Sequence, residues 1–363
     1  EMRQLLAWLL SALFAAGTLF SSGEAMLFEK WLPFKQETDA NRDADTSDSA
    51  AQKDEKDTSV EEAPVTYATL SFVGDLLLST MPGRYNGEDF LWYAEKEGPA
   101  YFLSGVADLF HADTYTFGNL ETVLSDRELT PIGKNYSPAY WYRSPTWITS
   151  ILTEGGIDIV SLANNHTGDF GEEGLADTRA AIEQAGLLWG DSDVTLMLHP
   201  GNANVAVYCC RIRSDGNCRE ALDWLKTVRD TTDFQIIYFH GGASMFRHTM
   251  DDNMREACHR LVDEGADLIV GHHPHVLQQV EWYRNVLIVP SLGALIFGDG
   301  KMENVSAILQ IELEIGSNGV KLRSTKFLPF ALWGERKWQP ALLQGEAAER
   351  VLGFLAGEYD TPL

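Results

Sequence analysis

The stretch Ala266–Gln278 reads ADLIVGHHPHVLQ and joins a short apolar run to three histidines. The run Leu268–Val270 predicts a buried strand, which a glycine ends. Because alternate side chains of an extended segment share one side, the rings of His273 and His275 can face one ligand, although His272 competes with His273 for its position. Imidazole is a common metal ligand, so this stretch predicts a metal site at a strand end.

Four other apolar runs predict strands that also end in polar residues. They are Thr69–Val73 before Gly74-Asp75, Thr114–Phe117 before Gly118-Asn119-Leu120-Glu121, Ile157–Leu162 before Ala163-Asn164-Asn165-His166, and Gln235–Phe239 before His240. In open α/β sheets, ligands bind at the carboxyl ends of the strands, so these residues are expected to converge. We expect the adjacent glycines, Gly74, Gly118 and Gly271, to allow close approach of metal or phosphate.

The polar residues at these strand ends are of the types that bind divalent metals. Carboxylate, amide and imidazole groups suit Mn, Fe, Zn or Mg, and the sequence does not select among these ions. The candidate metal ligands at these strand ends are Asp75, Glu121, Asn165 with His166, His240, and the three histidines His272, His273 and His275.

The order of the remaining elements predicts an α/β fold. Apolar spacing indicates helices over Gly171–Ala185 and about Asn253–Glu264. The C-terminal part shows strand patterns, at Val286–Val289, Val305–Ile315 and Lys321–Leu328. An α/β core that passes into a β-rich part predicts two sheets packed on each other and flanked by helices.

The N-terminal residues have a different composition. Arg3 precedes an uncharged apolar run, Leu5–Phe20, which predicts a signal anchor within residues 1–34, either retained or cleaved as a signal peptide. Both alternatives place the rest outside the membrane. Residues 35–64 are acidic and nearly lack large apolar side chains, so they predict a disordered linker. Residues 65–363 are the predicted globular domain, extracellular behind a single N-terminal pass in the cell membrane.

Charge and cysteine content restrict the function further. The formal net charge is −25, from 53 acidic and 28 basic residues, which argues against nucleic-acid binding. Adjacent Cys209 and Cys210 are expected to point to opposite faces of a strand. The sequence leaves open whether one of them pairs with Cys218 or all remain free and buried.

Several segments together resemble a known family. GDLLLS, GNLET, VSLANNHTGDFGEEGLADT, FHGG, GADLIVGHHPHVLQQVE and LIVPSLGALIFGD occur in the order found in the CapA-type capsule-synthesis family. That family is associated with poly-γ-glutamate production and resembles calcineurin-like metallophosphoesterases in fold. The resemblance covers roughly Leu70 to Asp299 and implies a four-layer α/β/β/α sandwich with a metal-type site at the strand ends.

The resemblance also implies a role for individual residues. Asp75 resembles the first-strand aspartate ligand, and Glu121 stands where a bridging aspartate is usual. His240 and His273 resemble ligands of one metal, and His275 a ligand of the other.

The same resemblance implies two catalytic residues and one further ligand. Asn165 resembles the amide ligand, and His166 the neighbouring histidine that protonates a leaving oxygen. Arg143, in YWYRSP, matches a position at which an arginine can hold a phosphate or carboxylate by two hydrogen bonds. The chain departs from the family at Leu77, where phosphoesterases have a histidine, and at Ala294, where the family has an asparagine. It also has Gly241 where the family has an aromatic residue.

Two functions fit these features. The first is a membrane-anchored component of poly-γ-glutamate biosynthesis or export that binds metal or the anionic polymer and assembles with membrane synthase or export subunits. The second is a metal-dependent hydrolase acting on a phosphoester or a polymer linkage, with His166 as general acid.

Overall fold

The computed structural model describes residues 64–81, 87–135, 139–242, 245–299 and 302–363. The predicted signal anchor and all but the last residue of the predicted linker lie outside these ranges. A search of the described helices finds none with the length and apolar character needed to span a bilayer.

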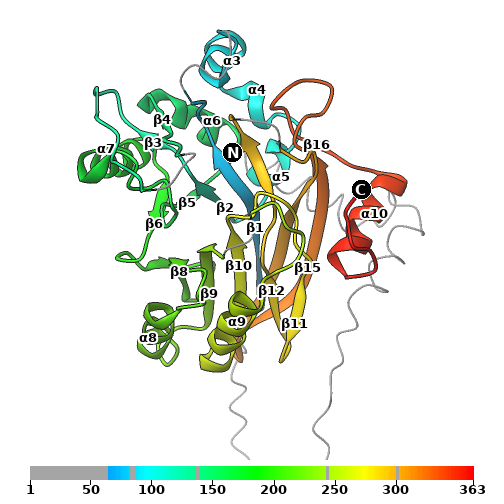
Figure 1. Cartoon of the computed structure of the whole chain (residues 1–363). Helices are drawn as coiled ribbons and strands as arrows, with labels where there is room; N and C mark the ends of the chain where they lie inside the picture. Colours follow the sequence, from blue (N-terminus) through cyan, green and yellow to red (C-terminus); the bar gives the residue numbers. More distant parts are fainter. Residues whose placement is uncertain (1–63, 82–86, 136–138, 243–244, 300–301) are drawn as a thin grey trace, which may run out of the picture. The chain divides into compact units, whose positions relative to one another are not determined.

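Two sheets lie at the centre of the described chain (Figure 1). The first sheet has eight strands among the described residues, in the order β16 (Ala341–Leu342), β15 (Gly319–Ala331), β14 (Ser306–Gly316), β1 (Thr66–Leu77), β2 (Tyr115–Leu120), β5 (Ile159–Ser161) and β6 (Leu188–Gly190), with β13 (Ala294–Phe297) pairing with β1. Strand β1 runs parallel to β2 and antiparallel to β14, so it joins the parallel half of this sheet to its antiparallel half.

The second sheet has six strands among the described residues, in the order β11 (Glu281–Tyr283), β12 (Val286–Val289), β10 (Leu268–His272), β9 (Phe234–Gly241), β8 (Val205–Ile212) and β7 (Leu196–Leu198). Its four inner strands, β12 to β8, are parallel, so their carboxyl ends lie at one edge. A separate short pair, β3 (Val123–Leu124) and β4 (Arg143–Ser144), follows β2 along the chain.

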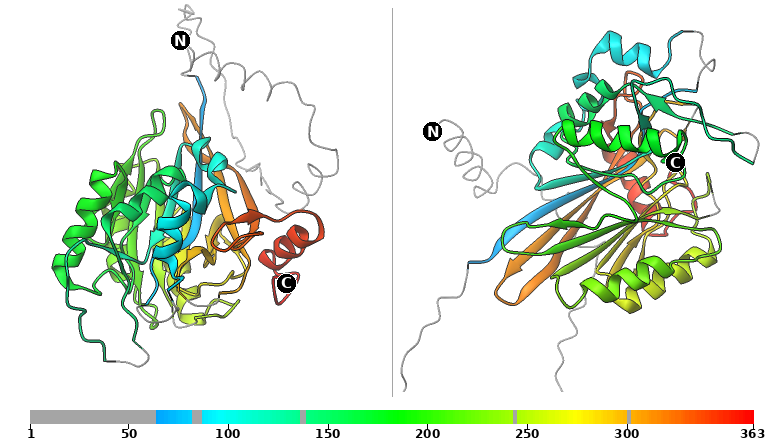
Figure 2. Two further views of the ribbon diagram at one scale, coloured as in Figure 1. Left: turned by 90° about the horizontal axis from the view of Figure 1, so that it is seen from above. Right: turned by 90° about the vertical axis from the view of Figure 1, so that its left-hand side faces the viewer.

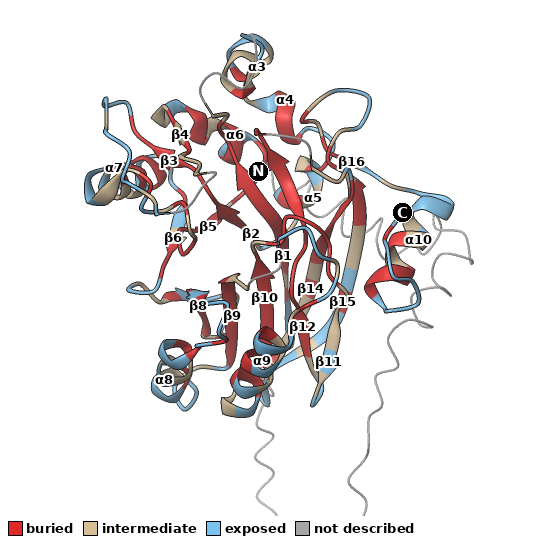
Figure 3. Cartoon of the chain, viewed as in Figure 1, coloured by how far each residue is buried: buried red, intermediate tan, exposed pale blue. Residues whose placement is uncertain are grey.

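The two sheets pack face to face through an apolar layer. Phe72 of β1 stacks on Phe117 of β2, with ring centroids 4.8 Å apart, and Tyr238 of β9 meets both rings from the second sheet. Leu70 and Val207 belong to the same buried cluster. Figure 3 shows the central strands of the two sheets, such as β1 and β10, buried along most of their length. Burial of apolar surface between the sheets therefore fixes how they are positioned.

Helices cover the outer faces of both sheets, as Figure 2 also shows. On the first sheet they are α3 (Phe90–Glu97), α4 (Ala100–Leu103), α5 (Ala107–His111), a 3-10 turn (Thr146–Ile148), α6 (Thr149–Glu154) and α7 (Gly171–Gln184). On the second sheet they are α8 (Arg219–Val228) and α9 (Asp252–Glu264). A last helix, α10 (Gly345–Leu355), places Phe354 in the layer between the sheets. The order helix, sheet, sheet, helix agrees with the predicted α/β sandwich.

The predicted helices and strands are present, with different bounds. Helix α9 begins at the predicted position because Asp251 accepts a hydrogen bond from the Met254 backbone, and it ends at Gly265, whose φ is 118°. The prediction for the first strand was too short, because β1 continues through Asp75 to Leu77. The parallel partner β13 pairs with these last residues, and no local pattern reveals that partner.

Contacts within the chain require glycine at the three positions Gly74, Gly118 and Gly271. A side chain at Gly74 would lie 2.2 Å from the carbonyl oxygen of Gly293, and one at Gly271 would lie 2.3 Å from that of Pro290. At Gly118 it would meet the side chain of Leu76. Glycine is therefore required by neighbouring parts of the chain itself, and the expected approach of a metal or phosphate stays a prediction.

The cysteines are free thiols, so the disulfide alternative is wrong. Cys209 faces the layer between the sheets, whereas Cys210 packs under the helices of the second sheet, as predicted from their adjacency. Cys218 and Cys258 are also buried and unpaired. Burial raises the pKa of Cys209 to about 12, which keeps its thiol protonated and unreactive.

Candidate metal centre

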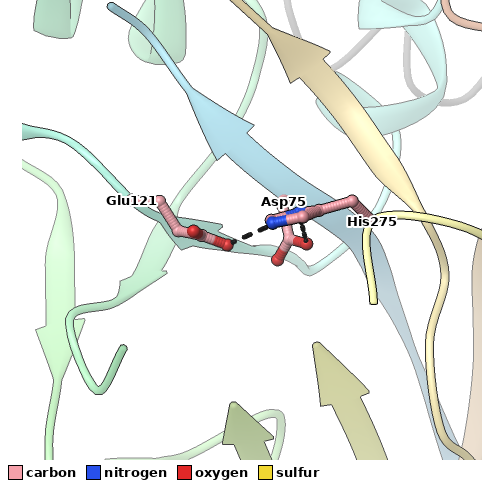
Figure 4. A group of neighbouring side chains, drawn as sticks. All are labelled: Asp75, Glu121 and His275. Carbon is pink, nitrogen blue, oxygen red and sulfur yellow. Dashed lines mark hydrogen bonds and ion pairs between the residues drawn. The ribbon is translucent and has the colours of Figure 1, made fainter. Parts of the chain in front are cut away.

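The polar strand ends of the two sheets meet in one buried cluster. Asp75, near the end of β1, is fully buried, and its backbone donates a hydrogen bond to the Gly293 carbonyl over 3.0 Å. Glu121 directly follows β2, and its backbone donates to the Leu76 carbonyl over 2.9 Å. His275 reaches both carboxylates from the loop after β10 (Figure 4). Residues far apart in the chain thus converge as the sequence predicts.

Asn119 holds the two carboxylates of the first sheet together. Its amide nitrogen lies 2.8 Å from Asp75 Oδ1 and 3.1 Å from Glu121 Oε1. The same nitrogen lies 3.1 Å from His240 Nδ1, which belongs to the second sheet. The amide of Asn164 in turn donates to the Asn119 side-chain oxygen and to a backbone carbonyl. A chain of amides therefore fixes the acidic side of the cluster.

The imidazoles of the second sheet and Asn165 form the opposite side. His240 Nε2 lies 2.5 Å from Asn165 Oδ1 and 3.1 Å from His273 Nδ1. Glu121 Oε1 lies 3.7 Å from the other ring nitrogen of His240. An amide oxygen and two imidazole nitrogens thus converge within reach of one small cation.

His272 and His275 approach Asp75 separately. His275 Nδ1 lies 2.8 Å from Asp75 Oδ2, and His272 Nδ1 lies 3.2 Å from Asp75 Oδ1. The ligand atoms of Asp75, Glu121 and His275 all lie within 4.8 Å of one another, as a shared cation requires. The sequence did not decide which of His272 and His273 is the metal ligand. The structure places His272 beside Asp75 and His273 beside His240.

The backbone around these histidines is strained. His273 has φ 106° and His275 has φ 58°, both in the region that favours glycine. Such conformations cost on the order of 1–3 kcal/mol each and gather at functional sites. The loop therefore uses backbone strain to aim these two rings at the carboxylates and at His240.

The two carboxyl groups differ in their affinity for protons. Burial raises the pKa of Asp75, but the imidazoles of His272 and His275 outweigh it and hold that pKa well below its usual range. Burial, followed by repulsion from the Asp75 and Asp169 charges, raises the pKa of Glu121 well above its usual range. Without a cation, therefore, Asp75 binds a proton less readily than Glu121 does.

Two of the imidazoles, those of His240 and His273, are neutral at physiological pH. Burial, followed by the charges of neighbouring histidines, holds the pKa of His240 well below its usual range. The same two causes lower the pKa of His273 to about 4. Neutral imidazole is the form that binds metal, so these rings need no deprotonation before they act as ligands.

A second set of contacts orients His166. Its Nδ1 lies 2.9 Å from Asp169 Oδ2, and its Nε2 lies 4.0 Å from Glu121 Oε2. Asp169 is itself buried and forms an ion pair of 2.5 Å with Lys134. Burial lowers the pKa of His166, although Asp169 acts in the opposite direction. The ring is thus held with one nitrogen facing the cluster.

Arg143 has contacts of a different kind. Its guanidinium donates to the backbone carbonyl of Arg127 and lies 5.6 Å over the Phe170 ring. Within the described ranges, no hydrogen bond or ion pair joins Arg143 to the metal cluster. Its predicted role in binding a phosphate or carboxylate stays a prediction.

Sequence reasoning missed Asn119 and Asp169 although both carried a signal. Asn119 stands two residues before Glu121 and has an amide side chain, so strand alternation puts both on one face. Asp169 follows His166 by three residues in a glycine-containing loop, a spacing that allows their contact. Lys134 carried no such signal, because it comes from a distant loop.

The donor set suits divalent cations. It combines carboxylate and amide oxygens with neutral imidazole nitrogens, which are the ligands of Mn, Fe and Zn. Both ring nitrogens of His272 are buried and lack a hydrogen-bond partner among the described residues. Buried polar atoms are normally paired, so these nitrogens indicate a bound partner. The residues therefore fit a divalent metal.

These features define an α/β domain with a buried cluster of acids, amides and imidazoles between two sheets. The chain matches the family model described as bacterial capsule synthesis protein PGA_cap over residues 69–190 and 198–299. Because these segments cover more than half of the chain, the protein belongs to that family.

Two curated relatives and one solved structure are similar to the chain. The PGA biosynthesis protein CapA of Bacillus subtilis (strain 168) is 24% identical over 275 residues, covering 69% of this chain and 68% of the relative. The capsule biosynthesis protein CapA of Bacillus anthracis is 26% identical over 284 residues, covering 70% and 65%. The chain thus spans about two thirds of the length of these relatives.

The solved structure is the calcineurin-like phosphoesterase YfkN from Bacillus subtilis. It is 12% identical, with a TM-score of 0.45, and the match covers 81% of this chain and 98% of that one. This likeness is too remote to establish a shared fold by itself.

Proposed function

We propose that this protein takes part in poly-γ-glutamate capsule biosynthesis or export and holds divalent cations between its two sheets. The observation that carries the proposal is the convergence of Asp75, Glu121 and the imidazoles in one buried cluster. Membership of the capsule-synthesis family supports the pathway, as do two relatives named for PGA and capsule biosynthesis. The metallophosphoesterase-like character rests on the donor set.

The cluster offers two groups of ligands. Asn165, His240 and His273 would hold one cation, while Asp75 and His275 would hold a second, with Glu121 between them. When bound, such cations supply positive charge that polarises an oxygen of a phosphate or carboxylate. The lowered pKa of Asp75 and the neutral imidazoles of His240 and His273 favour cation binding, whereas the raised pKa of Glu121 opposes it.

In this proposal, residues 1–34 anchor the protein to the cell membrane and residues 35–64 connect that anchor to the extracellular domain at residues 65–363. The partners are then the anionic polymer and membrane subunits that make or export it. The net charge of −25 disfavours polyanion binding over the general surface, so a polyanion needs a local source of positive charge. Bound cations supply that charge at the cluster.

Deletion of the coding gene tests this role. We expect cell-bound poly-γ-glutamate to fall sharply and to return with the wild-type gene. A gene carrying His240→Ala should not restore it, whereas one carrying His248→Ala should, because His248 lies outside the cluster and pairs with Glu303. Unchanged polymer in the deletion strain would refute the pathway assignment.

Membrane placement needs its own experiment. We expect the full chain to remain with membranes after a high-salt wash and to be digested when protease is added to intact cells. Release of the intact chain by salt, or protection from external protease, would contradict the anchored extracellular placement.

A second function, metal-dependent hydrolysis, is favoured by the contacts of His166. The ring is fixed by Asp169 at 2.9 Å and faces Glu121, a geometry suited to donating a proton to a leaving oxygen. We expect phosphodiesterase activity of the metal-loaded chain to fall about 100-fold or more in His166→Ala while the metal content stays unchanged. If metal binds but no ion supports turnover, the protein acts without hydrolysis.

A further inference from the structure

His272 lies in the layer between the sheets, immediately below the metal cluster. It is the last residue of β10 and pairs in register with His240 of β9, so both side chains leave the second sheet on the same face. The His272 ring packs against Tyr238, with ring centroids 4.5 Å apart. Its exposed fraction is 1%.

The polar atoms of this ring are unusual for a core histidine. Among the described residues, neither Nδ1 nor Nε2 of His272 has a hydrogen-bond partner. A histidine that only fills space would normally donate one N–H to a neighbour, because an unpaired buried donor or acceptor is destabilising. His259, by comparison, lies 2.6 Å from a carboxylate oxygen of Glu281.

The distance between His272 and Asp75 equals that between two ligands of one cation. Nδ1 of His272 lies 3.2 Å from Asp75 Oδ1 without the alignment of a hydrogen bond. Two ligand atoms that share one cation, each about 2.1 Å from it, are separated by about 3.0–3.4 Å at octahedral or tetrahedral angles. His273 Nδ1 and His240 Nε2, 3.1 Å apart, show the same separation in the other group.

We infer that His272 is a ligand of a cation bound by Asp75, on the Oδ1 side of that carboxylate, whereas His275 lies on the Oδ2 side. The adjacent histidines His272 and His273 then serve different cations, one on each side of Glu121. Leu77, two residues after Asp75, is apolar and fully buried, so β1 offers no further donor there. His272 supplies the nitrogen ligand from the facing sheet. This inference rests on the proposed cation binding at the cluster.

The test compares His272→Leu with His273→Leu in the full chain. Cation stoichiometry and affinity are measured by equilibrium dialysis against Zn²⁺, and the Co²⁺ absorption spectrum reports the ligand set. We expect the wild type to bind two ions and His272→Leu to bind one of them about 100-fold more weakly or more. His273→Leu should weaken the other ion, with a different spectral change.

Stability without metal separates a ligand from a packing residue. Leucine replaces an unpaired polar ring by an apolar group, so the metal-free His272→Leu protein should unfold at the same temperature as the wild type or higher. His272→Gln, which keeps a polar side chain, is the second variant if the first does not fold. His248→Leu, outside the cluster, is the control for loss of a histidine.

The outcomes are distinguishable. Two ions bound with unchanged affinity in both His272 variants would overturn the inference and leave the proposed cation site intact. A wild-type protein that binds no cation would overturn both.

Discussion

The two sheets bring opposite chemistry to the same place. The first sheet ends in carboxylates and amides, represented by Asp75, Glu121 and Asn119, whereas the second ends in the imidazoles of His240 and His275. Asp75 and His275 are 200 residues apart in the chain and 2.8 Å apart in space. Neither sheet alone holds the full donor set, so the site exists only when the apolar layer beneath it has packed.

The difference extends to charge. On the first sheet, repulsion between carboxylates adds to burial and raises the pKa of Glu121. On the second, neighbouring histidines add to burial and lower the pKa of His240. The first sheet therefore disfavours a second negative charge, and the second sheet disfavours protonated imidazoles. A cation between the sheets would offset the repulsion between the carboxylates while the imidazoles stay neutral.

The largest expected effect is that of Asp75→Ala. Asp75 is fully buried, lies 2.8 Å from His275 Nδ1 and accepts a hydrogen bond from Asn119, so its loss removes one of the links between the sheets. A buried polar group left without its partner costs on the order of 1–3 kcal/mol, and this substitution leaves two such groups. We expect this loss in denaturant unfolding of the metal-free protein, with cation binding abolished.

Asp223→Ala is the matched control, because Asp223 forms only exposed ion pairs on α8. It should change the free energy of unfolding by less than about 0.5 kcal/mol. Equal stability of the two variants would show that Asp75 does not join the sheets.

His240→Ala tests, from the second sheet, whether the two groups of ligands hold separate cations. It removes the nitrogen that lies against Asn165 and His273, so one cation should bind about 100-fold more weakly or more. The cation beside Asp75 should be retained. Calorimetric titration with Mn²⁺ would detect this, and simultaneous loss of both ions would contradict the division into two groups.

Cation binding should stabilise the folded chain. With free Mn²⁺ at about 100 times its dissociation constant, we expect about 2.7 kcal/mol of added stability per site. In Asp75→Ala, the stabilisation by the ion beside Asp75 and His275 should disappear. In His240→Ala, the stabilisation by the ion beside Asn165, His240 and His273 should disappear. No shift in the unfolding midpoint at any Mn²⁺ concentration would count against a folded-state site.

The last expected effect concerns pH. The pKa of His273 is about 4 in the folded protein and about 6.5 when unfolded, so the unfolded chain binds more protons between these values. Stability of the metal-free protein should therefore be complete above pH 6.5 and fall as the pH drops toward 4, by about 3 kcal/mol at most.

His273→Gln should flatten this dependence, measured as unfolding free energy against pH. A slope as steep as that of the wild type would assign the effect to other groups.

Much of the site could be predicted from local sequence. Alternation within strands and polar residues at their ends identified Asp75, Glu121, Asn165, His166 and the histidines after β10, because parallel strands share a carboxyl edge. The helix α9 followed from its apolar spacing.

Other features depend on contacts distant in sequence. The extension of β1 through Leu77 needs β13 as a partner, and Gly74 is required by the approach of Gly293. The separate places of His272 and His273 depend on a positive φ at His273, which residue type does not reveal. These are tertiary effects and leave no periodic signal.

The most direct test is anomalous diffraction from crystals of the protein grown with Mn²⁺. We expect one peak bounded by Asn165, His240 and His273, and a second beside Asp75 and His275. Manganese bound only elsewhere, or a cluster that excludes it at saturating concentration, would contradict the claim that the two sheets meet to form a cation site.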